Sequence, residues 1–232
     1  MRYKNIDKEL FVTNRSRLVK ELKPNSVAVV NANDIMPTNS DGTMRFRQNS
    51  DLFYLTGADQ EETILVLCPD FPDKKYREVL FLRETNEHIA TWEGHKLTKE
   101  ESRQTTGIET VLWLSEFPTL FKTMMVMGDV EYVYLNTNDH YRASVGVETR
   151  EARFVKDCML KFPLHKYERL APIMHRLRSV KSATEISLLQ QACDITEKGF
   201  RRLLTFVKPG ITEYEIEAEL AHEFLRNGSR GF

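Results

Sequence analysis

Short apolar runs, many of them β-branched, recur through the first two thirds of the chain. Residues 26–31 hold four consecutive small or branched apolar residues, which is typical of a strand covered on both faces. Similar runs predict strands at 63–68, 78–82, 110–114 and 131–135. Amphipathic or polar intervals predict helices at 6–22, 86–91, 98–106 and 116–126.

This alternation of strands and helices predicts an α/β fold in which helices pack on a sheet. The segment FPDKK at 71–75 lies between two predicted strands and has the composition of a hairpin loop. At least one strand pair should therefore be antiparallel. We expect a mixed sheet flanked by helices.

The pattern changes after residue 166, from where it predicts helices and no strand. Ser182 and Glu185 form a capping box, and apolar residues then recur three or four positions apart until Pro209 and Gly210. Most of this first helix should be buried. A second capping box opens at Thr212, and its helix should end at Asn227-Gly228. We expect one domain at 1–170, followed by a linker and helices at 171–232.

Composition narrows the classes of function. Hydrophobic residues make up 41% of the 232 residues, which is enough for an ordinary core, and the net charge is -1. That balance gives no reason to expect nucleic acid or a membrane surface as a partner. The chain has three cysteines without a CxxC pair, no signal-like start and no run of about 18 apolar residues. We expect a cytoplasmic protein.

Familiar catalytic patterns do not occur. The sequence contains no HExxH, GxSxG, P-loop or GxGxxG motif. Glu215, Glu219 and His222 share one helix face, but that face lies opposite an apolar stripe and should be solvated. We therefore predict neither a catalytic residue nor a metal ligand in this chain.

Residues 46–57 read FRQNSDLFYLTG, which resembles the FRQNSDFYYLTG element of the family of Xaa-Pro aminopeptidases (aminopeptidase P), prolidases and creatinase. Residues 92–94 (WEG), 178–186 (RSVKSATEI) and 208–213 (KPGITE) resemble further family motifs, and the resemblance covers the whole chain. Within the 46–57 element, Arg47 and Gln48 should be fold-making hydrogen bonders, and Ser50 or Asp51 should cap the following turn.

The resemblance implies a ribonuclease H-like N-terminal domain, followed by helices that open a truncated pita-bread catalytic domain. It implies a metal-dependent hydrolase that removes the residue before proline from peptides, with two divalent ions, usually Mn. All metal ligands are then expected downstream of Phe232, so this portion would be inactive alone. Its implied role is to shape the substrate cleft and a homo-oligomer. A prolidase, or a non-catalytic binding module on the same scaffold, remains an alternative.

Trp92 has two interpretations. A tryptophan beside a turn most often packs in a core. The resemblance instead makes Trp92 a substrate-cleft residue, with Glu93 and His95 as weaker candidates, because the family carries a Trp-x-Gly segment here and uses this domain to wall the cleft, often of a neighbouring subunit. Many members have Arg after the glycine, whereas this chain has His95 and Lys96.

Overall fold

The computed structural model describes residues 6–142 and 146–229, which fall into two compact units. The first unit comprises residues 6–178, and the second comprises the described residues 179–229. The sequence predicts a boundary after residue 170. The helix that follows this point, Ala171–Ser179, contributes Ile173, Met174 and Leu177 to the core of the first unit, so the division comes after Arg178.

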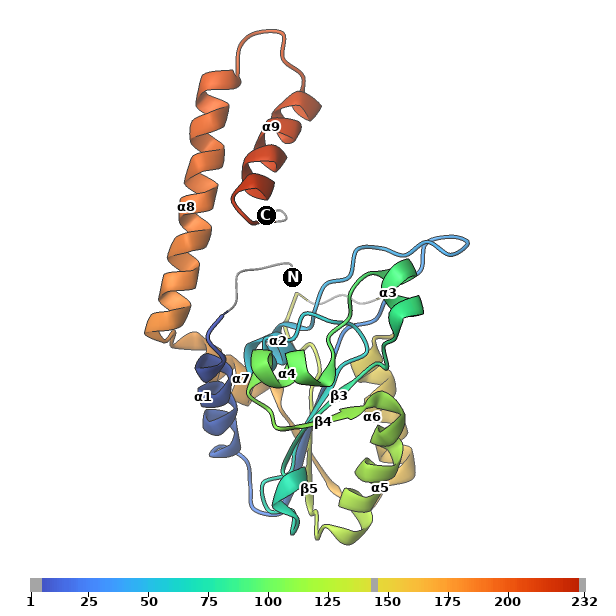
Figure 1. The fold of residues 1–232 in the computed structure, drawn as a ribbon. Helices are drawn as coiled ribbons and strands as arrows, with labels where there is room; N and C mark the ends of the chain where they lie inside the picture. Colours follow the sequence, from blue (N-terminus) through green and yellow to red (C-terminus); the bar gives the residue numbers. More distant parts are fainter. Residues whose placement is uncertain (1–5, 143–145, 230–232) are drawn as a thin grey trace. The chain divides into compact units, whose positions relative to one another are not determined.

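The first unit contains a six-stranded mixed sheet in the order β4-β3-β2-β1-β5-β6 (Figure 1). Strand β2 is antiparallel to β1 and β3, and the pairs β1–β5, β3–β4 and β5–β6 are parallel. This confirms the predicted α/β class and the antiparallel hairpin at 71–75. The strands are β1 (Ser26–Asn31), β2 (Ile64–Leu67), β3 (Glu78–Leu82), β4 (Thr110–Trp113), β5 (Tyr132–Leu135) and β6 (Lys166–Arg169).

Helices cover both faces of this sheet, and alternating strand residues feed two separate cores. Ala28 and Val30 of β1 pack with residues of α1, α2 and α7, whereas Val27 and Val29 pack with residues of α5 and α6 (Figure 1). Double coverage explains why the strand runs are continuously apolar. The helices are α1 (Lys8–Val19), α2 (Ser50–Thr56), α3 (Glu87–Glu93), α4 (Lys99–Thr106), α5 (Phe117–Met127), α6 (Arg150–Lys161) and α7 (Ala171–Ser179), with 3-10 turns at Lys74–Tyr76 and Leu114–Glu116.

Two local predictions were wrong, and one helix was missed. Strand β6 begins at Lys166, in the region predicted to contain no strand. Its residues are mostly polar, and their place in the sheet comes from pairing with β5. Helix α6 was not predicted. The turn expected near residue 50 is helix α2. Its N-cap is Asn49, not Ser50 or Asp51, and the Asn49 side chain accepts hydrogen bonds from the amides of Asp51 and Leu52.

The second unit is a pair of helices, α8 (Ala183–Phe206) and α9 (Glu213–Arg226). The Ser182–Glu185 capping box is formed as predicted. At the second box, the Glu215 carboxylate accepts from both the amide and the hydroxyl of Thr212, at 2.8 and 2.7 Å. The side-chain hydroxyl therefore donates here, and only the glutamate half of the reciprocal box is present.

The two helices meet at Gly199 of α8. A Cβ atom at this position would lie 2.6 Å from the Leu220 side chain and 3.0 Å from the Phe224 ring of α9, so a larger residue here would displace these side chains. Phe224 is buried there. The expectation that most of α8 is buried was wrong, because α9 covers only the strip around Gly199, the one residue of α8 that is buried.

Candidate functional site

The predicted cleft segment forms helix α3 and the loop after it. Strand β3 ends at Leu82, and Arg83 then leads through a short link to Asn86, whose side chain accepts the Ile89 amide at 2.9 Å and so caps the helix. Every residue of α3 is exposed or half-buried. The helix therefore stands on the surface of the first unit rather than in its core.

Trp92 lies in the last turn of α3 with 78% of its surface exposed. Its ring centroid is 6.4 Å from that of His88, one turn earlier. Among the described residues, Trp92 therefore packs in no core. A large apolar ring this exposed on a short capped helix is suited to contact with a ligand or another chain.

Glu93 is committed to an ion pair. Both of its carboxylate oxygens accept from Arg83, at 2.7 and 2.8 Å, in a forked arrangement. Arg83 also lies 3.2 Å from Glu62. The hydrogen bonds from Arg83 hold the pKa of the Glu93 carboxyl below its ordinary value. Glu93 thus ties the end of α3 to the end of β3. Because Arg83 occupies both of its oxygens and lowers the pKa of its carboxyl, Glu93 is a poor candidate for a general base.

His95 lies close to the start of α4. Its Nε2 is 3.1 Å from a carboxylate oxygen of Glu101, and Glu101 also accepts the Thr98 amide in the capping box of that helix. The backbone hydrogen bond from Thr98, with the Thr98 hydroxyl and His95 nearby, lowers the pKa of Glu101. His95 therefore extends a structural cap and does not lie against a second candidate group.

A second anchor holds the far end of this segment. The Leu97 amide donates to Gln60 Oε1 at 2.6 Å, and Lys96 pairs with the buried Glu61. Gln48 donates to the main-chain oxygens of Ala58 and Gln60, at 3.0 and 2.7 Å. The prediction that Gln48 makes fold-making hydrogen bonds is confirmed.

Sequence reasoning missed the supporting residues Gln60, Glu61 and Arg83. Each lies at or beside a strand end on the same edge of the sheet: Arg83 follows β3, and the other two precede β2. For Glu61 and Arg83 the only sequence signal was the presence of opposite charges at the ends of successive strands, and the uncharged Gln60 had none. Together they fix both ends of the segment that carries Trp92, while the indole itself stays exposed.

The described residues offer no metal centre. Within 6–142 and 146–229, no group of three or more His, Cys, Asp and Glu side chains is arranged to hold a metal ion. Two acids on the helix face considered as a metal site have other partners: Glu219 pairs with Arg202 at 2.7 Å, and Glu215 caps its own helix. The described residues therefore do not fit a divalent cation.

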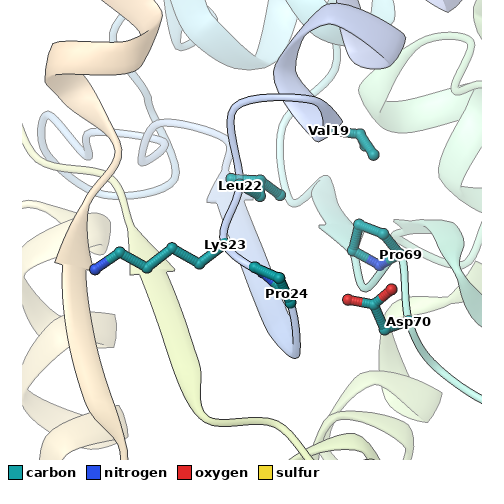
Figure 2. Close-up of a pocket in the computed structure, with 6 residues that line it drawn as sticks. All are labelled: Val19, Leu22, Lys23, Pro24, Pro69 and Asp70. Carbon is teal, nitrogen blue, oxygen red and sulfur yellow. The ribbon is translucent and has the colours of Figure 1, made fainter.

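A pocket of about 240 Å³ lies away from the candidate segment, where α1 leads into β1. Its polar groups are already engaged: Asp70 accepts the Asn25 amide at 2.8 Å, and Lys23 pairs with Glu168. Figure 2 shows the Lys23 side chain extending away from the other lining residues. The pocket is lined by Val19, Leu22, Lys23, Pro24, Pro69 and Asp70.

Among the described residues, no helix is long and apolar enough to cross a bilayer.

Comparison with known proteins agrees with this architecture of an α/β unit followed by a helical pair. Residues 11–134 match the family model described as the aminopeptidase P N-terminal domain, and residues 187–232 match metallopeptidase family M24. The first match covers more than half of the chain. The chain belongs to the family of proteins that carry the aminopeptidase P N-terminal domain, which confirms the resemblance drawn from residues 46–57.

Individual relatives give the same result. The Xaa-Pro aminopeptidase of Escherichia coli is 29% identical over 97% of this chain and 51% of its own length, and that of Haemophilus influenzae is 27% identical over 97% and 49%. The E. coli aminopeptidase P structure superposes with a TM-score of 0.81 at 27% identity, over 98% of this chain and 51% of that one. The Pseudomonas aeruginosa aminopeptidase PepP, at 23% identity, shares the fold with a TM-score of 0.83, over 97% and 50%. The chain spans about half the length of the curated relatives it matches.

Proposed function

We propose that this chain is the N-terminal portion of a metal-dependent Xaa-Pro aminopeptidase, which removes the first residue from peptides with proline second. Residues to about 178 would act as its N-terminal domain, and the α8–α9 pair would open its catalytic domain. The family match over 187–232 and the named activity of the relatives support this assignment.

In this proposal the chain itself is non-catalytic. The metal ligands would lie in the part of the relatives' length that this chain does not span, and they would hold two divalent ions, with Mn as our expectation. When bound, such ions polarise the peptide carbonyl and activate water. We further propose that the protein is a cytoplasmic homo-oligomer acting on proline-containing peptides.

Trp92 is the residue through which we propose that this N-terminal portion contacts the substrate. We propose that its indole forms part of the wall of a substrate cleft, in its own subunit or a neighbouring one. The supporting observation is an exposed aromatic ring on a helix whose last residue is held by the Arg83–Glu93 fork and whose following loop is held by the Gln60–Leu97 hydrogen bond. An aromatic ring held in this way can contact a peptide at low cost in conformational entropy.

The test compares Trp92→Ala with Tyr141→Ala in the complete enzyme. Tyr141 is a matched control, since it is an aromatic side chain of the first unit with 82% exposure. Loss of one aromatic contact is expected to lower kcat/KM for a tripeptide with proline second by about tenfold, equivalent to about 1.4 kcal/mol. The control should keep its activity.

Two further measurements make the proposal falsifiable. This chain alone, supplied with Mn, should show no turnover of the tripeptide, and repurified material that retained turnover would contradict its non-catalytic role. A complete enzyme that cleaved only Xaa-Pro dipeptides would be a prolidase. Equal kcat/KM for the Trp92→Ala and Tyr141→Ala variants would remove Trp92 from the cleft.

A further inference from the structure

The last turn of α7 is held by side chains from two other helices. A helix leaves its final carbonyl groups without partners from within the helix. Here the Leu177 carbonyl accepts from Tyr54 Oη of α2 and from Arg17 Nη2 of α1, both at 3.2 Å. Arg17 Nη1 lies 3.3 Å from Tyr54 Oη, so the three groups form a closed triangle. Two separate helices therefore cap the same carbonyl.

The next residue along the chain is held as well. Arg178 Nη1 donates to Asp51 Oδ1 at 2.7 Å, and Asp51 Oδ2 accepts from Asn136 Nδ2 at 3.0 Å. The Asp51 side chain is only 16% exposed, and Asn136 is buried beside the end of β5. Asp51 thus joins the end of α7 to the sheet through charged and neutral hydrogen bonds.

Helix α2, which supplies Asp51 and Tyr54, is itself fixed against α1. The buried Asn14 donates to the Tyr54 carbonyl at 2.9 Å, and the buried Arg15 donates to the Leu55 carbonyl at 2.7 Å. Gly57 ends α2 with a φ of 69°, and a Cβ there would lie 2.3 Å from the Phe11 ring. Only glycine fits this approach, so the residues that hold α7 are rigidly placed.

These contacts converge on Leu177 and Arg178, the last two residues of the first unit. We propose that the 46–57 segment positions the end of α7, with Asp51 and Tyr54 as positioning residues that fix where the main chain leaves the first unit. In the proposed enzyme this point leads into the catalytic part, and only that consequence rests on the proposed function. The positioning itself is tested without activity.

The experiment measures the mobility of a nitroxide label at residue 180 in the full chain. Val180 is exposed and lies two residues beyond Arg178. Labelling uses Val180→Cys in a Cys193→Ser background, since Cys193 is the exposed native cysteine. Cys68 and Cys158 are buried, and burial raises the pKa of their thiols to about 12 and about 11, so they should resist labelling.

Asp51→Asn, Tyr54→Phe and the double variant are compared with Asp139→Asn. Asp139 is a matched control: it is 18% exposed, pairs with Arg169 at 2.6 Å and accepts a second bond from Thr137. We expect each positioning variant to raise the mobile fraction of the label spectrum at least twofold, and the control to leave it unchanged. Arg178→Lys should stay near the parent, whereas Arg178→Met should behave like Asp51→Asn.

Superimposable spectra for the parent and the Asp51→Asn and Tyr54→Phe variants would overturn the proposal. So would an equal gain in mobility in Asp139→Asn, because the effect would then be a general loosening of the fold. Cooperative thermal unfolding of each variant shows that the label reports on the exit and not on unfolding. Should the double variant fail to fold, Tyr54→Phe, which removes one hydroxyl group, decides the matter.

Discussion

The two units differ in how their apolar residues are used. In the first, both faces of the sheet are covered, and residues such as Leu65, Leu80 and Phe81 are fully buried. In the second, the helices touch along one strip, and many large apolar side chains remain more than half exposed. These are Val180, Ile186, Leu189, Phe200, Leu204, Val207, Tyr214 and Leu225.

This difference shows that the local sequence signals that form a helix are distinct from the tertiary contacts that bury it. Helices α8 and α9 have capping interactions and amphipathic faces, which are local properties of the sequence. Burial requires a second layer, and α9 supplies only part of one. We therefore expect the stability of the chain to reside in the first unit.

The largest expected effect contrasts core truncations in the two units. Leu80→Ala removes a fully buried side chain and should destabilise the first unit by about 2–5 kcal/mol. Leu204→Ala removes one that is 82% exposed and should change stability by no more than about 0.5 kcal/mol. Urea unfolding followed by tryptophan fluorescence measures this, since both tryptophans, Trp92 and Trp113, lie in the first unit.

The same pair of variants can contradict the proposed difference between the two units. A loss of several kcal/mol on Leu204→Ala would show that the second unit contributes to the stability of the first. A small effect of Leu80→Ala would show that the sheet core is looser than its burial indicates.

A smaller effect should appear in the pH dependence of the first unit. Glu151, at the start of α6, is buried and accepts from both the amide and the side chain of Asn31, at 2.9 Å each. Burial raises the pKa of its carboxyl to about 7, and the nearby Asp51 acts in the same direction, whereas Asn31 and Arg150 oppose it. The folded protein therefore holds this proton more tightly than the unfolded chain.

This difference in proton affinity fixes the direction in which stability changes with pH. The protonated Glu151 carboxyl stabilises the folded first unit. This contribution to the free energy of unfolding is fully present below the ordinary pKa of 4.5 and is lost as pH rises through about 7. The loss amounts to about 3 kcal/mol at most. We expect the free energy of unfolding of the first unit to fall between pH 5 and 8 relative to Glu151→Gln, whose amide does not titrate. Parallel curves for the two proteins over this range would contradict the assignment.

Much of the fold was predictable because its strands are buried on both faces. Strands β1 and β3 were placed at their observed bounds, and the Ser182 cap came from two residues alone. Strand β6 was missed because its short polar sequence has no apolar pattern, and pairing with β5 is a long-range contact. Helix α6 did carry a signal: Thr149 caps it, and Phe154, Val155 and Cys158 recur at helical spacing.

The candidate site was less predictable. The position of Trp92 beside a turn could be read from the sequence, but its exposure could not, because a tryptophan there packs equally well against a core. The supporting contacts join residues far apart in the chain, such as Lys96 with Glu61 and Leu97 with Gln60. No local pattern encodes such pairs, and they become visible only when strand ends meet at one edge of the sheet.

The most direct test of the account compares the full chain with a version that ends at Arg178. The central claim is that the first unit contains its own complete core and does not depend on α8 and α9. Urea unfolding followed by tryptophan fluorescence should then give the same midpoint and the same slope for both proteins. A lower midpoint or a non-cooperative transition in the shorter chain would show that the first unit needs the second, and would contradict the account.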